Sequence, residues 1–412
     1  AVGAASKASG TNATAVGQTA NAFGQNSFAG GQASNALGKS SVALGDGANA
    51  LNDSAVALGA YTNANNAGAT AVGFNTNASG WASFAGGHSA KAEASSAVAL
   101  GHEAQAVGGK AVAIGKSSHA TKESGIALGD EAQAAGSKAV AIGKTSYAAK
   151  DSGIALGDGA KAAEVNAIAI GSGNNAWKED SIAFGRAANA DGAASLALGL
   201  SSHTREANAI ALGNNANADD TNSIAIGTNS KADQAAAIAI GNNVKAKKYS
   251  SVVIGEDAES NNSRSVVIGY RASATNPAMA ASGQDTNQTV AIGAYANAYG
   301  DQSTAIGNNV FAKGDSSIAI GSDDWDTVAA KTVEGTGKTV KEVYHDYTGD
   351  VMATGPGSYD LATSGEAAVA IGAKSLATAE LSTAFGTGTH ALGVASAAFG
   401  MGAKATQGNS VA

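Results

Sequence analysis

The stretch KAVAIGKSS stands at Lys110–Ser118, and the nearly identical KAVAIGKTS stands at Lys138–Ser146. Each copy is a short apolar run that closes on Gly-Lys-Ser or Gly-Lys-Thr, as a phosphate-binding loop does. That loop needs a glycine five residues before the second one, and these positions hold Lys110 and Lys138. No amphipathic helical pattern follows either copy, so the resemblance between the two stretches has another cause, which is repetition.

A glycine closes such an apolar run every 14 residues. The series begins at Gly3 and continues without a miss to Gly269, resumes at Gly293 for three repeats, and resumes again at Gly372 for three more. That gives 26 repeats. The repeat glycines include Gly115, Gly143, Gly171 and Gly227. A fixed period of this kind indicates a solenoid of stacked coils.

Each repeat has the pattern of two short strands and two turns. The residues three before and one before the glycine are mostly large and apolar, as Ile224 and Ile226 are, and the residue between them is nearly always alanine, as Ala225 is. Apolar residues two apart mark one strand face, and we expect that face to point into the core. A glycine every 14 residues among β-branched residues opposes a helix. The sequence therefore predicts an all-β fold, a parallel stack of 14-residue coils.

The alanine between the two large residues lies on the opposite strand face, although alanine is a poor strand former. Close approach of another backbone would explain it, because a larger side chain would hold the neighbour away. We therefore expect a homo-oligomer whose chains pack through the alanine faces.

Two repeats depart from the usual pattern of large residues at two positions at once. Phe28 and Phe84 stand three residues before the repeat glycine, and Gly30 and Gly86 stand one residue before it. A ring beside an emptied neighbour is typical of volume compensation in a packed interior.

The composition narrows the function classes. The 412 residues include 55 glycines and no cysteine, and the net charge is −8. Without cysteine there is no disulfide framework and no thiolate zinc site, and the negative charge disfavours a nucleic-acid partner. His102-Glu103 begins like the zinc-protease motif HExxH, but Ala106 stands where the second histidine belongs. We expect no cofactor and no bound metal.

Runs such as SVALG, AVAIG and NSIAIG at 14-residue spacing, followed by small residues three and five positions after the glycine, resemble the head of YadA-like trimeric autotransporter adhesins. The resemblance covers nearly the whole chain. It implies a left-handed parallel β-roll (a β-solenoid), a homotrimer of chains side by side, and no catalysis. It also implies display at the bacterial cell surface, with an outer-membrane anchor in a C-terminal region outside this fragment. The partners that it implies are a host extracellular-matrix protein, a cell-surface receptor or glycan, and other bacterial cells.

Two insertions interrupt the coils. We expect regular β-roll coils over residues 1–269, a coil with a short insertion over 270–292, coils over 293–321, a larger insertion over 322–368, and final coils over 369–412 that stop within a repeat. Both prolines, Pro277 and Pro356, fall inside the insertions, which favours loops that leave the stack. In the larger insertion, TVAAKTVE and KTVKEVYH flank Gly335-Thr336-Gly337, and this arrangement predicts a β-hairpin.

Two sets of residues are candidates for ligand contact. The larger insertion carries Trp325, Tyr344 and Tyr347, and aromatic residues on a projecting loop are a usual binding signature. The second set follows from the resemblance, because collagen binding in the family is associated with a repeated NSVAIGxxS string. The closest match here is NSIAIGTNS, which begins at Asn222 and Ser223 and ends at Ser230.

A β-solenoid can also be an enzyme. Glu206 and Asp220 both stand seven residues after a repeat glycine, on adjacent repeats. Their carboxyl groups could therefore lie about 4.8 Å apart, near the separation in a retaining glycosidase. The alternative interpretation is a polysaccharide-cleaving β-solenoid of the tail-spike type. The position falls in a polar loop without an aromatic platform, so we expect a solvated acidic stripe and no enzyme activity.

Overall fold

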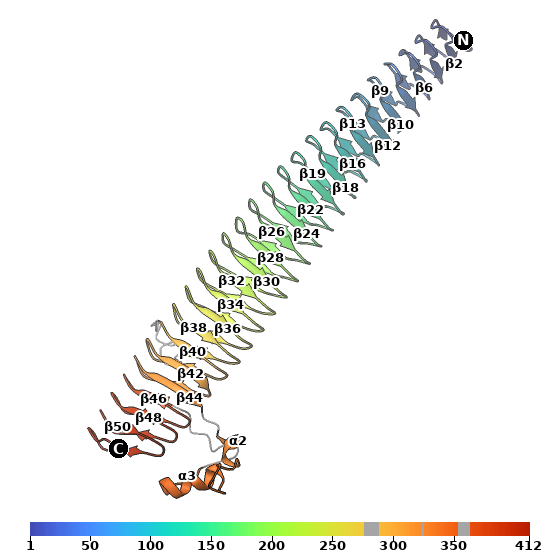
Figure 1. The fold of residues 1–412 in the computed structure, drawn as a ribbon. Helices are drawn as coiled ribbons and strands as arrows, with labels where there is room; N and C mark the ends of the chain where they lie inside the picture. The colour runs from blue at the N-terminus through green and yellow to red at the C-terminus, as the bar shows by residue number, and fades with distance from the viewer. Residues whose placement is uncertain (276–287, 323–324, 353–362) are drawn as a thin grey trace. The chain divides into compact units, whose positions relative to one another are not determined.

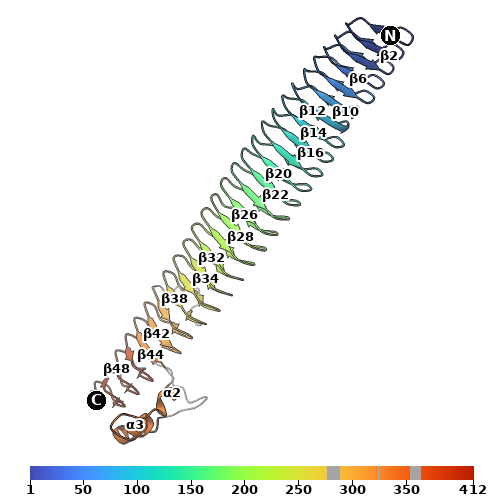
Figure 2. The same ribbon diagram turned by 45° about the vertical axis from the view of Figure 1, so that its right-hand side comes forward.

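The computed structural model describes residues 1–275, 288–322, 325–352 and 363–412. The chain divides into two compact units, Ala1–Ser202 and His203–Ala412. Within each unit, short parallel strands stack coil upon coil into a β-solenoid, and the helices of the described residues lie in the larger insertion (Figures 1 and 2). No helix in this described part of the chain is long and apolar enough to cross a membrane.

Each unit contains a major and a minor sheet, and in the second unit the minor strands after the larger insertion form a separate four-stranded sheet. The major sheet consists of strands of three to five residues that begin three residues before the repeat glycine, and the minor sheet consists of the two-residue strands that follow it. The major-sheet strands of the first unit are β2 (Thr14–Val16), β4 (Phe28–Gly30), β6 (Val42–Leu44), β8 (Val56–Leu58), β10 (Thr70–Phe74), β12 (Phe84–His88), β14 (Val98–Leu100), β16 (Val112–Ile114), β18 (Ile126–Leu128), β20 (Val140–Ile142), β22 (Ile154–Leu156), β24 (Ile168–Ile170), β26 (Ile182–Phe184) and β28 (Leu196–Leu198). Its minor-sheet strands are β1 (Lys7–Ala8), β3 (Asn21–Ala22), β5 (Asn35–Ala36), β7 (Asn49–Ala50), β9 (Asn63–Ala64), β11 (Asn77–Ala78), β13 (Lys91–Ala92), β15 (Gln105–Ala106), β17 (His119–Ala120), β19 (Gln133–Ala134), β21 (Tyr147–Ala148), β23 (Lys161–Ala162), β25 (Asn175–Ala176) and β27 (Asn189–Ala190).

The second unit repeats this arrangement. Its major-sheet strands are β30 (Ile210–Leu212), β32 (Ile224–Ile226), β34 (Ile238–Ile240), β36 (Val252–Ile254), β38 (Val266–Ile268), β40 (Val290–Ile292), β42 (Thr304–Asn308), β44 (Ile318–Ser322), β46 (Val369–Ile371), β48 (Thr383–Phe385) and β50 (Ala397–Phe399). Its minor-sheet strands are β29 (His203–Thr204), β31 (Asn217–Ala218), β33 (Lys231–Ala232), β35 (Lys245–Ala246), β37 (Glu259–Ser260), β39 (Ser273–Ala274), β41 (Asn297–Ala298), β43 (Phe311–Ala312), β45 (Thr363–Ser364), β47 (Leu376–Ala377), β49 (His390–Ala391) and β51 (Lys404–Ala405).

Strands pair in parallel with the corresponding strand of the next coil. In the major sheet Ala113 pairs with Ala127, and in the minor sheet Ala120 pairs with Ala134. The same register spans both insertions, because Val266 pairs with Val290 and Ile318 pairs with Val369. Residues 276–287 of the short insertion lie outside the described residues. The major-sheet strands on either side of each insertion therefore keep the same faces.

The strand faces of the major sheet are the reverse of those predicted. In the coil around Gly115, the fully buried residues are Ala111, Ala113, Ser118 and Ala120. The large neighbours of Ala113 point outward, and Ile114 is 38 % exposed. The predicted packing of chains through the alanine faces is therefore wrong, since these alanines form the core of a single chain. Each coil has so few residues between its two turns that most inward side chains are alanine or serine, and the largest fully buried ones are valine, threonine and asparagine, as Val253, Thr62 and Asn174 are.

Most serines that take alanine's place in this core donate their hydroxyl to a turn carbonyl, although the hydroxyls of Ser27 and Ser263 have no hydrogen-bond partner among the described residues. The Ser118 hydroxyl donates to the Gly115 carbonyl at 3.0 Å, and the Ser41 hydroxyl donates to the Gly38 carbonyl at 2.7 Å. Both carbonyls belong to the turn three residues earlier. A buried serine thereby satisfies its own polar group and a turn acceptor together.

Two features require glycine at the repeat position: its backbone conformation and its contact with the next coil. Gly115 has φ 131°, and a Cβ there would lie 2.6 Å from the carbonyl carbon of Gly129 in the next coil. Left-handed residues close the two turns of the coil, as Ser117 (φ 53°) and Ser124 (φ 57°) do. Only the glycine position combines positive φ with direct contact to the adjacent backbone, and this combination explains the period seen in the sequence.

The predicted volume compensation between a phenylalanine ring and a neighbouring glycine exists, but it lies on the outer face of the major sheet. A Cβ on Gly30 would lie 2.9 Å from the Phe28 ring and 2.8 Å from Leu44 Cδ1. Phe28 is itself partly exposed, while Ala29 between the two is fully buried. The ring therefore lies across the glycine on the outside of the coil, and the predicted location in a packed interior is wrong.

The larger insertion differs from the predicted β-hairpin. Thr332 and Thr339 form one antiparallel bridge, whereas the flanking segments contain helices α2 (Asp326–Ala329) and α3 (Val340–Thr348). Helix α3 begins with a capping box, in which the Thr339 hydroxyl accepts from the Glu342 N–H and the Glu342 carboxylate accepts from the Thr339 N–H. This T-x-x-E signal outweighs the strand propensity of the threonines and valines.

The assignment of inner and outer faces can be tested within the single strand β19. Ala134→Leu places a larger side chain between the sheets, and we expect it to lower the free energy of unfolding by about 1–3 kcal/mol, because the core has no room for it. Gln133→Leu places the same side chain on the outer face, where we expect a change within about 0.5 kcal/mol. Urea unfolding followed by circular dichroism measures both variants. Equal destabilisation by the two substitutions would contradict this assignment.

Candidate functional site

The larger insertion has a small core of its own. Trp325, Ala329, Tyr344 and Met352 pack together and are nearly fully buried. The Trp325 and Tyr344 rings meet edge to face with centroids 5.3 Å apart, a favourable geometry for aromatic pairs. Burial raises the pKa of the Tyr344 phenol. The described part of the insertion is therefore a folded element rather than an open loop.

This core rests on the coils that follow the insertion. Lys374 lies under the Trp325 ring, with its Nζ 5.1 Å from the ring centroid, and is only 4 % exposed. One coil further on, a Cβ on Gly388 would come within 2.7 Å of the Tyr344 hydroxyl. Lys374 and Gly388 occupy the same turn position of adjacent coils. The insertion therefore packs on a column of turns, where glycine leaves room for the tyrosine.

Helix α3 is held on this column at its C-terminal end as well. Gly402 continues the column, and a Cβ there would overlap the Thr348 side chain. The Lys404 ammonium lies 2.7 Å from the Asp350 carboxylate, directly after the helix. Apolar contact and an ion pair thus fix α3 at two points.

The three aromatic residues predicted to contact a ligand have different environments. Trp325 and Tyr344 are 6 % and 5 % exposed, whereas Tyr347 is 80 % exposed. The structure brings the first two together as the joint between insertion and coils. Of the three, Tyr347 is the residue that a ligand can reach. The sequence could not separate them, because which face of α3 is covered depends on how the helix docks.

The candidate residues of the NSIAIGTNS string also differ in their exposure to solvent. The Ser223 hydroxyl donates to the Asp220 carbonyl at 2.6 Å and the Ser230 hydroxyl donates to the Gly227 carbonyl at 2.9 Å, and both serines are fully buried. Asn222 is exposed and accepts a hydrogen bond from the Asn208 amide at 3.2 Å. The two serines therefore stabilise turns, and Asn222 is the member of the set that faces solvent.

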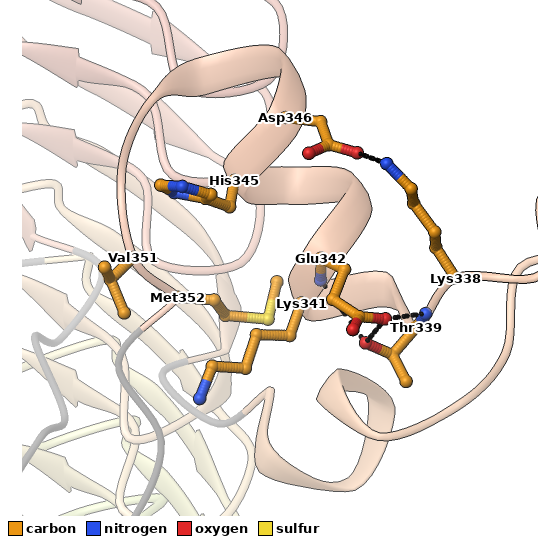
Figure 3. A pocket seen from close by; sticks show the side chains of 8 residues that line it. All are labelled: Lys338, Thr339, Lys341, Glu342, His345, Asp346, Val351 and Met352. Carbon is orange, nitrogen blue, oxygen red and sulfur yellow. Dashed lines mark hydrogen bonds and ion pairs between the residues drawn. The ribbon is translucent and has the colours of Figure 1, made fainter.

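A cavity of about 600 Å³ opens beside α3 (Figure 3). Lys338, Lys341 and His345 supply basic groups, and Val351 and Met352 supply an apolar side. Sequence reasoning missed this cavity because it did not predict the helix. The capping box and the four-residue spacing of Lys341 and His345 were signals that could have placed both side chains on one helix face.

Hydrogen bonds determine the charges around this cavity. Glu342 accepts from the Thr339 N–H at 2.7 Å and from the Thr339 hydroxyl at 2.8 Å, and these bonds lower the pKa of its carboxyl group. Lys338 forms an ion pair with Asp346, which raises the pKa of Lys338. Both carboxylates of the lining are thus engaged within the insertion.

A column of four rings runs along the turns of the first unit. Tyr61, Phe74, His88 and His102 come from successive coils, and neighbouring ring centroids are 5.9, 5.2 and 5.0 Å apart. The His88 and His102 rings lie 12° from parallel. Because Phe74, His88 and His102 stack face to face, the column presents mainly ring edges to solvent, whereas a sugar stacks on an open ring face. The column stabilises the turns and is a poor candidate for a glycan site.

The residues of the enzyme alternative stand on polar turns. Glu206 is exposed, and Asp220 Oδ1 accepts a hydrogen bond from the Thr221 N–H at 2.6 Å. Beside them, Asp219 pairs with Arg205 at 3.5 Å. Within the described ranges, no group of three or more histidine or carboxylate side chains is placed to hold a metal ion. No specific observation therefore favours catalysis at this position.

The coils, but not the insertion, match a known protein family. The family model described as YadA head domain repeat (2 copies) matches thirteen segments that together cover more than half of the chain. The matched segments are 1–19, 8–34, 36–62, 82–104, 92–118, 120–146, 148–174, 178–202, 207–230, 221–243, 246–272, 287–309 and 364–389. A comparison with curated proteins found no match. The larger insertion, with its cavity, falls between the last two matched segments.

The docking of α3 can be tested with two glycines of the same turn position, Gly402 (φ 67°) and Gly173 (φ 66°). Alanine at either position costs about 1–2 kcal/mol in left-handed backbone conformation. At Gly402 the added methyl group would also overlap Thr348, whereas at Gly173 no atom lies within 4 Å of it. We expect Gly402→Ala to increase amide hydrogen exchange in α3 and Gly173→Ala to leave it unchanged. Unaltered exchange in the Gly402→Ala variant would show that this contact does not hold the helix.

Proposed function

Because the chain belongs to the family of YadA head domain repeats, which is an adhesin family, we propose that it is the head of a trimeric autotransporter adhesin. In this proposal three copies lie side by side as left-handed parallel β-rolls of 14-residue coils. They are displayed at the bacterial cell surface by a protein anchored in the outer membrane. The head acts by binding and carries out no catalysis.

The outer face of the major sheet is the observation that carries the proposal. Large apolar residues on it are exposed in the single chain, and Leu44 reaches 49 %. Other exposed residues that stand three before or one before a repeat glycine are Val16, Phe28, Ile114, Ile142, Phe184, Leu198, Leu212, Ile268, Ile318, Phe385 and Phe399. An apolar face continued over so many coils exceeds what soluble monomers usually leave uncovered. Other copies of the same chain would cover it.

The energetic gain from such packing is large. Fully burying one leucine or isoleucine side chain contributes about 1.5–3 kcal/mol, and the face offers such a residue in most coils. Three identical chains close a ring, so that no apolar face remains to recruit a fourth. Trimer formation would thereby stabilise coils whose own cores contain little more than alanine and serine.

The proposed ligands are a host extracellular-matrix protein, a cell-surface receptor or glycan, and other bacterial cells. Threefold display gives even a weak contact a high effective concentration. On the coils, contact would involve Asn222 rather than Ser223 and Ser230, because both serines are buried. On the insertion, Tyr347 is the exposed aromatic residue.

The trimer is tested first by its mass. Sedimentation equilibrium should give about three times the chain mass of 39.6 kDa. The double variant Leu44→Asp and Ile142→Asp should dissociate towards the monomer, because each buried carboxylate without a partner costs several kcal/mol. The control variant Ser40→Asp and Thr145→Asp adds the same charges in exposed turns and should remain trimeric. A monomeric parent protein, or a double variant that stays trimeric, would contradict packing through the outer face of the major sheet.

The binding role of the insertion is tested by replacing residues 323–362 with Gly-Ala. That pair restores the two residues that other coils have between Ser322 and the following minor strand, which begins at Thr363 here. We expect the coils to keep their unfolding midpoint and the protein to lose binding on a panel of immobilised matrix proteins and glycans. Binding that survives the replacement would place the ligand contacts on the coils instead. A parent protein that binds nothing on the panel, or on whole cells, would argue against the adhesin proposal itself.

A further inference from the structure

The cavity beside α3 has the size and rigidity of a small-ligand site. Its volume of about 600 Å³ falls within the roughly 300–1,000 Å³ that pockets for small molecules commonly have. Its lining comes from α3, from the residue pair that precedes the helix, and from Val351 and Met352 (Figure 3). The contacts of Tyr344 and the Asp350–Lys404 ion pair hold these walls against the coils. Little ordering would therefore be needed when a ligand binds.

The negative charges of the lining are already compensated. Glu342 is engaged by the two hydrogen bonds from Thr339, and Asp346 is engaged by the Lys338 ammonium. Figure 3 shows these pairs together on one side of the group of side chains. An anion entering from the opposite side would meet neither carboxylate as an unpaired charge.

Lys341 and His345 are the polar groups left for a ligand. Among the residues that the structure describes, no hydrogen bond or ion pair engages the Lys341 ammonium. The His345 Nδ1 lies 3.2 Å from the Asp350 carbonyl oxygen. Because that oxygen can only accept, the hydrogen bond assigns the proton to Nδ1 and leaves Nε2 as an acceptor. The two side chains stand one helical turn apart and extend towards the side where Val351 and Met352 lie (Figure 3).

Val351 and Met352 complete the site with apolar surface. Met352 is buried in the core of the insertion, while Val351 is 71 % exposed although it lines the cavity. The arrangement is thus one free cation, one hydrogen-bond acceptor and a patch of exposed hydrocarbon. A ligand that matches all three carries an acidic group, a hydroxyl group and a face of C–H bonds.

We propose that this cavity binds a carboxylate-bearing sugar residue, such as a sialic or uronic acid of a glycan. The Lys341 ammonium pairs with the sugar carboxylate, His345 Nε2 accepts a hydrogen bond from a ring hydroxyl, and Val351 packs against the C–H face of the ring. A compact cavity with one free cation suits a single acidic ring better than an extended acidic peptide, which brings several charges. The choice of ligand rests on the proposed function, since a surface-displayed head meets such glycans.

Isothermal titration of the full chain with N-acetylneuraminic acid and with glucuronic acid tests the proposal. We expect binding of at least one acidic sugar and none of the neutral N-acetylglucosamine. Lys341→Met keeps the aliphatic stem and removes the charge, and it should weaken binding about tenfold or more. Lys331→Met removes an exposed lysine of the same insertion from outside the cavity, and it should bind as the parent does. Unchanged hydrogen exchange in α3 verifies that Lys341→Met remains folded.

Three results would overturn the proposal. They are absence of binding by the parent protein, equal weakening by Lys341→Met and Lys331→Met, and preference for a pentaglutamate peptide, which would indicate an acidic protein partner. Val351→Asp supplies a second route, because it adds a negative charge to the apolar wall without touching Lys341 and should also abolish binding. The titrations use free sugars, so their failure is distinguishable from failure of the mass and panel measurements that test the adhesin head.

Discussion

The narrow space between the two sheets of each coil is the constraint on which this structure depends. Each coil fits two tight turns, each with a left-handed residue, into a 14-residue repeat, so its two sheets lie too close together for most large side chains. Alanine and serine fill most of the inward positions, and most of these serines bond to the turn carbonyl three residues earlier, as Ser118 and Ser146 do. Side-chain size, rather than hydrophobicity, therefore decides which residues form the core.

The outer surface follows from the same constraint. Because the coil cannot enclose its leucines, isoleucines and phenylalanines, most of them lie on the outer face of the major sheet. A solenoid of this kind gains little stability from its own core, since an alanine buries far less apolar area than a leucine. Covering the outer face with identical chains would supply the missing burial, and stability and assembly would then be coupled along the coils.

The larger insertion shows how such a regular structure can acquire an individual site. The major sheet continues in register on either side of it, whereas the minor strands that follow it, from β45 to β51, form a separate four-stranded sheet. It docks by placing Trp325 and Tyr344 over turn positions where Lys374 and Gly388 accommodate them. Its own lining then offers a cavity of about 600 Å³ into which Lys341 and His345 extend. Under the proposed function, the coils would supply display and the insertion would supply selectivity.

The sequence by itself determined the period, the strand and turn positions, the parallel register and the two insertion points, because each depends on local spacing and on glycine's backbone. It also identified the family. Only the tertiary structure decided which strand face is the core, because alternation of alanine with isoleucine is compatible with either face until the distance between the sheets is known. The same holds for Trp325, Tyr344 and Tyr347, whose packing or exposure depends on how α3 docks on distant turns. Spacing along the chain specifies the coil, whereas inside and outside are set by the room between elements that the chain brings together.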